Sequence, residues 1–278
     1  MQVRRIVLYG ERQQLSDIDC HDSPSGILTA ALTITRPNEL PSIAKHCEQN
    51  VIKVTENLRK IQDLLALETQ SAGRPSGSVQ LLAVSKRQPL QAVLDAASAG
   101  QRDFGENFAQ EGIDKMLAAD RSDLIWHFIG HLQSNKTRVV AEHYQWVHTV
   151  DRLKIAQRLS DQRPDSMGDL NICLQVNIDD EDSKSGLAPD DVAAVAAEVA
   201  SLPRLKLRGL MCIPAISASA QEQREPFAQM RQLLVNINKS GLELDTLSMG
   251  MTADYPAAVQ EGATIVRIGT ALFGARGE

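Results

Sequence analysis

The chain has 278 residues, of which 43% are hydrophobic, enough to bury one large core. Its net charge of −6 is spread over interleaved acidic and basic residues and only 4% of the residues are aromatic, which argues against a surface for nucleic acid. The four cysteines form no C-x-x-C pair, and no stretch has the about eighteen apolar residues of a membrane span, so we expect a cytoplasmic protein without a membrane partner.

The first forty residues differ from the rest of the chain. They contain one modest apolar stretch, Ile27–Ile34, between segments rich in turn-forming residues. We expect residues 1–40 to be a poorly ordered extension and residues 41–278 to form one domain. From Ser42 onward apolar residues recur every three or four positions, which predicts a helix that ends at the glycine- and proline-containing stretch 71–78.

Short apolar runs then alternate with amphipathic segments. The runs, which we interpret as buried strands, are 79–84, 102–104, 125–129, 146–150, 172–178, 207–213, 244–247 and 265–268. The segments between them, which we interpret as helices, are 91–99, 110–118, 135–142, 153–159, 189–201, 222–239 and 255–261. This alternation predicts a parallel sheet, either a closed (β/α)8 barrel or an open doubly wound sheet. No G-x-G-x-x-G follows the first strand and eight strands suffice to close a parallel sheet, so we predict the (β/α)8 TIM-type barrel.

Functional residues in such barrels follow the carboxyl ends of the strands. Lys86 is the only lysine directly at a predicted strand end. A desolvated lysine there can lose its proton and attack a carbonyl group to form a Schiff base, although on position alone a solvated lysine is the simpler interpretation. The other predicted strands are followed by polar residues, proline or glycine: Glu106-Asn107, Gly130-His131, Asp151, Asn177, Pro214, Ser248 and Gly269-Thr270.

The ends of the last two strands resemble a phosphate site, which this fold often builds from the loops after strands seven and eight. Gly250 and Gly269 let backbone N–H groups approach an anion, and Ser248 and Thr270 add hydroxyl donors. Ordinary tight turns would have the same residues. A phosphate site opposite a Schiff-base lysine is, however, what pyridoxal 5′-phosphate (PLP) requires.

Seven motifs at or near these strand ends carry a resemblance to a known family. They are Leu82–Lys86, Phe104–Asn107, Trp126–Lys136, Glu181–Gly186 with Asn177 before it, Arg208–Met211, Leu247–Met251 and Val266–Thr270. Together they resemble the PLP homeostasis protein family, also called proline synthase co-transcribed homologues, from about Ser42 to Gly277. The chain departs from the family at Thr252, where a serine is usual, and at residues 1–40, which have no counterpart.

The resemblance implies PLP as the cofactor and seven cofactor-binding residues: Lys86, Asn107, Ser248, Gly250, Arg267, Gly269 and Thr270. The lysine would carry the Schiff base, and the serine, the threonine and the two glycines would bind the phosphate. Arg267 would face the pyridine nitrogen, N1. Because an arginine stays protonated, it donates a hydrogen bond to N1 but does not leave a proton there, which makes the ring a poor electron sink.

Two further groups invite a functional interpretation. His127 and His131 have the spacing of a helical zinc pair, but their segment is a predicted strand, in which four residues span roughly 13 Å, so we expect no metal site. Lys184 lies in a predicted loop, and the resemblance assigns it a secondary role in handling PLP.

The barrel also resembles the PLP domain of alanine racemase and of ornithine-type decarboxylases, which add a C-terminal β-domain. The chain ends eight residues after Thr270 and has no tyrosine after Tyr255 that could act as a racemase acid. We therefore expect a monomeric PLP carrier without catalytic residues, with apo-forms of PLP-dependent enzymes as its partners. The alternatives are a minimal PLP-dependent racemase or decarboxylase, and a barrel enzyme for a phosphorylated sugar with Lys86 as an aldolase-type base.

Overall fold

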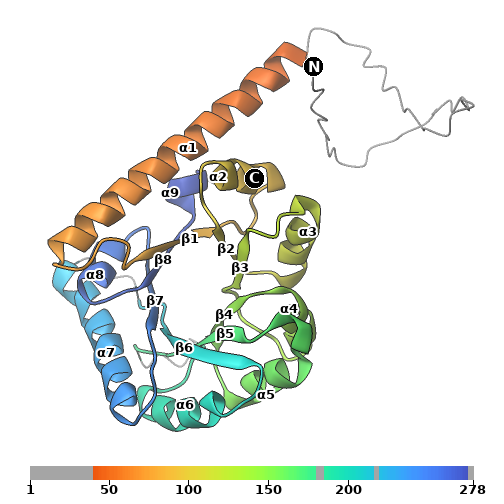
Figure 1. Cartoon of the computed structure of the whole chain (residues 1–278). Coiled ribbons are helices and arrows are strands. Elements are labelled where there is room, and N and C mark those ends of the chain that lie inside the picture. The colour runs from red at the N-terminus through yellow and green to blue at the C-terminus, as the bar shows by residue number, and fades with distance from the viewer. Residues whose placement is uncertain (1–39, 180–184, 216–218, 275–278) are drawn as a thin grey trace, which may run out of the picture. The chain divides into compact units, whose positions relative to one another are not determined.

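Eight strands form a closed parallel barrel in the order in which they occur along the chain (Figure 1). The computed structural model describes residues 40–179, 185–215 and 219–274. The strands are β1 (Gln80–Val84), β2 (Asp103–Glu106), β3 (Ile125–Phe128), β4 (Trp146–Val150), β5 (Leu170–Gln175), β6 (Leu205–Met211), β7 (Thr246–Met251) and β8 (Ile265–Ile268). Leu82 of β1 pairs with Arg267 of β8, which closes the barrel. The predicted (β/α)8 barrel is therefore confirmed.

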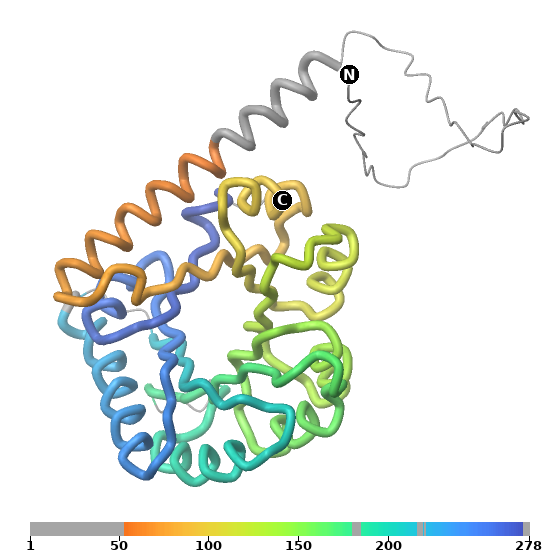
Figure 2. Tube along the Cα trace, in the orientation of Figure 1, coloured from red at the N-terminus to blue at the C-terminus, as the bar shows by residue number. Residues whose placement is uncertain are grey.

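Helices connect successive strands and surround the barrel. They are α1 (Leu40–Ser71), α2 (Leu90–Ser98), α3 (Ala109–Ala119), α4 (Thr137–His143), α5 (Leu153–Gln162), α6 (Val192–Ala200), α7 (Ala220–Lys239), α8 (Tyr255–Gln260) and α9 (Thr270–Phe273). Figure 2 follows the chain once around the barrel, so that the orange start of the domain meets its blue end. The short helix α9, directly after β8, has no counterpart among the predicted elements.

The largest difference from the predicted strands concerns β7, which was predicted to end before Ser248. The strand instead continues to Met251, so the expectation that Ser248 stands at its end is wrong. Leu247 and Met249 point outward into the core, while Ser248 between them is completely buried as well. A polar residue marks the end of a strand only where the inner face of the barrel is apolar. In this barrel the inner face carries buried polar side chains, so a serine can lie within a strand.

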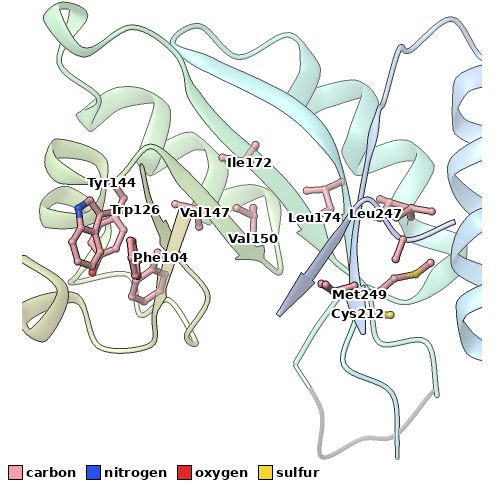
Figure 3. Packing of buried hydrophobic residues seen from close by; sticks show 14 of the residues in the cluster. Phe104, Trp126, Tyr144, Val147, Val150, Ile172, Leu174, Cys212, Leu247 and Met249 are labelled. Atoms are coloured by element: carbon pink, nitrogen blue, oxygen red, sulfur yellow. The ribbon is translucent and has the colours of Figure 1, made fainter. Parts of the chain in front are cut away.

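The outer face of the barrel is the main hydrophobic core. Outward-facing residues of the strands pack against the helices, and Figure 3 shows Phe104, Trp126 and Tyr144 lying together in this layer. The rings of Phe104 and Trp126 are 5.6 Å apart between centroids. Val54 and Leu58 of α1 belong to the same cluster. Each fully buried side chain of this size contributes about 1.5–3 kcal/mol to folding, and together they fix the strands that carry the site.

The inner face of the barrel is mixed in character. Its apolar part is a separate small cluster of buried residues: Leu82, Ile129, Trp146, Cys173, Met211 and Ile265. Buried polar side chains lie beside it, among them His127, His148, Ser248 and Arg267. Because side chains alternate between the two faces of a strand, Ile265 and Arg267 point inward while Val266 and Ile268 join the outer core.

The predicted N-terminal extension lies outside the described residues except for Leu40, where α1 begins, and Lys184 also lies outside them. The chain divides into two units, Met1–Lys45 and His46–Glu278, with the boundary inside α1. Among the described helices, none is long and apolar enough to cross a membrane.

Candidate functional site

A pocket of about 190 Å³ opens at the carboxyl ends of β1, β7 and β8. It brings together five of the seven residues predicted to bind the cofactor: Lys86, Asn107, Arg267, Gly269 and Thr270. The other lining residues are Val84, Gln88, Ile129, Ile213, Met251 and Thr252. The pocket therefore combines one lysine and one guanidinium with hydroxyl groups and an apolar wall.

Lys86 is held through the backbone on both sides of it. The carbonyl oxygen of Ser85 accepts a hydrogen bond from Lys115 Nζ at 2.7 Å. The N–H group of Arg87 donates to Glu111 Oε1 at 2.5 Å. Arg87 has a φ of +58°, a left-handed conformation that is uncommon for residues other than glycine. These contacts fix the direction in which the half-buried Lys86 leaves β1.

Lys115 connects these contacts to a buried carboxylate. Its Nζ lies 2.8 Å from both Glu106 Oε1 and Glu111 Oε1. Ser85 Oγ donates to the same Glu106 oxygen at 2.6 Å. Desolvation raises the pKa of Glu106 above its ordinary value, and the charge of Lys115 opposes this rise. We therefore infer that the positive charge of Lys115 stabilises the buried carboxylate of Glu106, which contacts Ser85, the residue before Lys86.

Arg267 forms part of the floor of the pocket and is held by three hydrogen bonds. NH1 donates to the carbonyl oxygen of Ser248 at 2.5 Å and to its Oγ at 2.9 Å, and NH2 donates to the carbonyl oxygen of Cys212 at 2.8 Å. Burial lowers the pKa of the guanidinium, which nevertheless stays protonated in proteins. These bonds use three of the five N–H groups of a guanidinium, and Arg267 also lines the pocket.

The structure places Ser248, like Gly250, outside the lining of the pocket. Its Oγ is completely buried and accepts from Arg267, and it lies 2.7 Å from His148 Nδ1. Ser248 is not among the residues that line the pocket. The hydroxyl group therefore acts on the pocket through Arg267, because the strand extends four residues beyond its predicted end at Leu247.

The two glycines predicted to bind the anion lie at the end of β7, where Gly250 is the last residue but one, and directly after β8, where Gly269 lines the pocket. Gly250 has a φ of +92°, and a Cβ atom there would lie 2.6 Å from the Cβ of Ala258, so no other residue fits. A Cβ atom at Gly269 would lie 3.0 Å from the carbonyl oxygen of Val84. Thr252 and Thr270 follow these two glycines and are exposed at the mouth of the pocket.

A second pocket of about 260 Å³ adjoins the first and shares Asn107, Ile129 and Ile213 with it. Its wall is largely polar and includes Thr149 and Gln175. Asn107 Oδ1 is buried and has no hydrogen-bond partner among the described residues. An unpaired buried acceptor is unfavourable, so this oxygen is suited to a donor on a ligand.

The two histidines considered as a zinc pair differ in their surroundings. His127 is buried in β3, and His131 is exposed beyond its end. Within the described ranges, no group of three or more histidine, cysteine, aspartate or glutamate side chains is arranged to hold a metal ion.

Sequence reasoning missed two residues of this region. Thr252 was noted only as a departure from a motif, although a hydroxyl after a glycine turn is a recognisable anion donor. Lys115 lies in the predicted helix 110–118 and was not singled out, and its ion pair with the buried Glu106 is what distinguishes it. The spacing of Lys115 and Glu111, four residues apart on α3, was the available signal.

Comparisons with known proteins agree with this geometry. The family described as alanine racemase, N-terminal domain, matches residues 50–277. The pyridoxal phosphate homeostasis protein of Pseudomonas aeruginosa is 56% identical over 223 residues, which are 80% of this chain and 96% of that protein. The protein of the same name from Escherichia coli is 48% identical over 226 residues, 80% of this chain and 97% of that protein.

Among solved structures, PipY of Synechococcus elongatus with PLP bound superposes with a TM-score of 0.70. It is 38% identical, over 80% of this chain and all of PipY. The identities and the nearly complete coverage of these relatives show that they and this chain are homologous. The chain belongs to the pyridoxal phosphate homeostasis protein family, which is built on the barrel of the alanine racemase N-terminal domain.

Proposed function

We propose that this protein binds PLP in the pocket at the carboxyl ends of β1, β7 and β8, and that it holds the cofactor for other proteins. One observation carries the proposal: Lys86, the buried guanidinium of Arg267 and the turn at Gly269 and Thr270 line the same pocket. PLP needs an amine for its aldehyde, a partner for its pyridine nitrogen and donors for its phosphate, and the pocket offers all three.

The residues fit the cofactor group by group. Lys86 would hold the aldehyde carbon through its Nζ, with the loss of one water molecule. Arg267 donates to N1, and the backbone of Gly269 with the hydroxyl groups of Thr252 and Thr270 binds the phosphate. Asn107 Oδ1 accepts from a donor on the bound molecule. Gly250 shapes the end of β7, and Ser248 acts through Arg267.

The same residues favour holding PLP over catalysis. When bound, PLP supplies an aldehyde for amines and a pyridine ring that can withdraw electrons. Arg267 keeps N1 unprotonated, which weakens this withdrawal. Racemisation also needs an acid on one face and a base on the other, and among the described residues of the pocket only Lys86 and Arg267 have ionisable side chains. An arginine does not serve as a base.

The test of this function is transfer to a PLP-dependent enzyme. PLP-loaded protein is mixed with the apo-form of such an enzyme and with a scavenger that removes free PLP. We expect the apo-enzyme to gain activity faster than it does with the same amount of free PLP and scavenger. Turnover of an amino acid by the loaded protein alone at about 1 s⁻¹ or more would contradict the carrier role.

The two exposed threonines provide a prediction about the phosphate. We expect Thr252→Val and Thr270→Val each to weaken PLP binding by roughly tenfold, because a hydrogen bond to a charged group contributes about 1.5–3 kcal/mol. Pyridoxal, which has no phosphate, should lose little. Binding titrations of both vitamers measure the difference.

The matched control for these variants is Thr55→Val on the exposed side of α1. It should leave the affinities for PLP and pyridoxal unchanged. If the two pocket variants weakened both vitamers equally, the hydroxyl groups would support the fold of the turns and not bind the phosphate.

A further inference from the structure

We propose that a chain of buried hydrogen bonds through the inside of the barrel, from Asp103 through His127, His148 and Ser248, positions the guanidinium of Arg267 for the cofactor. This inference rests on the proposed binding of PLP, because Arg267 acquires its role only when N1 lies against it. The five residues come from β2, β3, β4, β7 and β8. We call them the polar relay.

The contacts of the relay are continuous. His127 Nε2 lies 3.0 Å from Asp103 Oδ1, and His127 Nδ1 lies 2.9 Å from His148 Nε2. His148 Nδ1 lies 2.7 Å from Ser248 Oγ, and Arg267 NH1 lies 2.9 Å from the same oxygen. The two histidines and the serine are completely buried. Asp103 is the first residue of β2, so the relay crosses the barrel from the end opposite to the pocket.

With both imidazoles neutral, the carboxylate end of the relay determines the direction of its hydrogen bonds. The carboxylate of Asp103 only accepts, so His127 Nε2 carries a proton and its Nδ1 is bare. His148 must then donate from Nε2 and accept at Nδ1 from the hydroxyl of Ser248. Arg267 only donates, and Ser248 Oγ can accept from it. In this assignment the two imidazoles are neutral and protonated on Nε2, and the hydrogen bond from Arg267 to Ser248 Oγ is compatible with it.

The surroundings of the histidines keep them neutral. Desolvation lowers the pKa of His127, although the hydrogen bond and charge of Asp103 oppose it. The pKa of His148 is lowered well below its ordinary value by desolvation, by the repulsion that a protonated His127 would add, and by the charge of Arg267. Trp146 stacks on His127 with ring centroids 5.3 Å apart and so covers one face of the imidazole ring.

The relay explains how a cation is tolerated inside the barrel. The hydrogen-bond partners that the structure records for Arg267 are uncharged oxygens of Ser248 and Cys212. An aligned chain of hydrogen bonds polarises each member, and here its negative end is the carboxylate of Asp103. Dipoles that point toward a buried cation reduce its desolvation cost.

The relay is therefore a positioning device and not a path for protons. Arginine does not release a proton under these conditions, so no proton can pass along the chain to N1. What the relay fixes is the orientation of the guanidinium before the cofactor arrives. A donor held in place loses little freedom on binding, which strengthens the contact with N1.

The first experiment measures the ring nitrogens of histidine by nitrogen-15 NMR in the full-length protein without PLP. Signals are assigned with His127→Gln and His148→Gln. At neutral pH we expect both rings to be neutral, with the proton on Nε2 and a bare Nδ1. A proton on Nδ1, or a positively charged ring, at either position would overturn the relay.

The second experiment changes the far end of the relay, where the side chain of Asp103 is 14% exposed. Asp103→Leu removes the acceptor, whereas Asp103→Asn keeps one for His127. In Asp103→Leu we expect both tautomers in the NMR spectrum, about tenfold weaker PLP binding and a shifted visible absorption maximum of bound PLP. Asp103→Asn should restore the tautomers, the maximum and most of the affinity.

The exposed Asp123, which pairs with Arg121, provides the matched control as Asp123→Leu. It should match the wild type in all three measurements. If Asp103→Leu also kept the wild-type tautomers, affinity and absorption maximum, the relay would not position Arg267. If the wild-type protein did not bind PLP, the proposed function would fail, while the NMR experiment would still decide whether the relay exists.

Discussion

Replacing Lys86 with alanine is expected to abolish the visible absorption of the PLP-loaded protein. The band arises from the Schiff base, and Lys86 follows β1 directly at the pocket that Arg267 and Thr270 also line. No other lysine is among the described residues of that pocket. PLP retained through its phosphate and ring alone would absorb as the free aldehyde, so the spectrum separates covalent from non-covalent binding.

Reduction with borohydride and peptide mapping identifies the residue that carries the cofactor. The wild-type protein should yield one labelled peptide, which contains Lys86, and Lys86→Ala should yield none. The exposed Lys136 serves as the control, and Lys136→Ala should keep the band and the label. A band that survives in Lys86→Ala would contradict the assignment. A wild-type protein without a band that still binds phosphorylated sugars would favour the aldolase-type alternative.

The overall fold could be predicted from the sequence because its signal is periodic. Apolar runs that alternate with amphipathic segments predict the barrel, and β4 and β8 have the predicted bounds. Both strands are bounded by clear changes in polarity, whereas the serine and glycine within β7 resemble a turn. Where the inward-facing residues of a strand are polar, the change from apolar to polar residues no longer marks the end of the strand.

The candidate site could be predicted only in part, again because the polar residues inside the barrel leave no periodic pattern in the sequence. The motifs place Lys86, Arg267 and Thr270 at the pocket, since strand ends meet on one rim. They do not show that His127 points inward toward His148, a contact between neighbouring strands. The sequence favoured no metal at His127 but offered no other role for a buried imidazole. Hydrogen bonds across a barrel depend on register, which composition and spacing do not fix.

Replacing Lys115 with methionine is expected to lower the free energy of unfolding by about 3–5 kcal/mol, because it leaves the carboxylate of Glu106 buried without its cation. Glu106 is completely buried, and its Oε2 has no hydrogen-bond partner among the described residues. Methionine fills the space of the lysine stem, so a cavity contributes little. Urea denaturation measures the change, and the exposed Lys154→Met on α5 is the control.

The double variant tests whether the unpaired charge is the cause. Glu106→Gln removes the charge that Lys115→Met leaves behind, so Glu106→Gln/Lys115→Met should be more stable than Lys115→Met alone. Each single variant is measured beside it to complete the cycle. A loss below about 1 kcal/mol in Lys115→Met, or a double variant no more stable than it, would show that Lys115 does not neutralise Glu106.

The loss in Lys115→Met should also depend on pH in a definite direction. Desolvation already raises the pKa of Glu106 above the ordinary 4.5, and removing Lys115 removes the charge that opposes this rise. A carboxyl group whose pKa is higher in the folded protein favours folding while it is protonated, and this contribution is lost as the pH rises through the folded value. The deficit should therefore be small at mildly acidic pH and full at mildly alkaline pH. A deficit that is equal at both, or larger at acidic pH, would mean that the lysine stabilises β1 and α3 by packing and not by its charge.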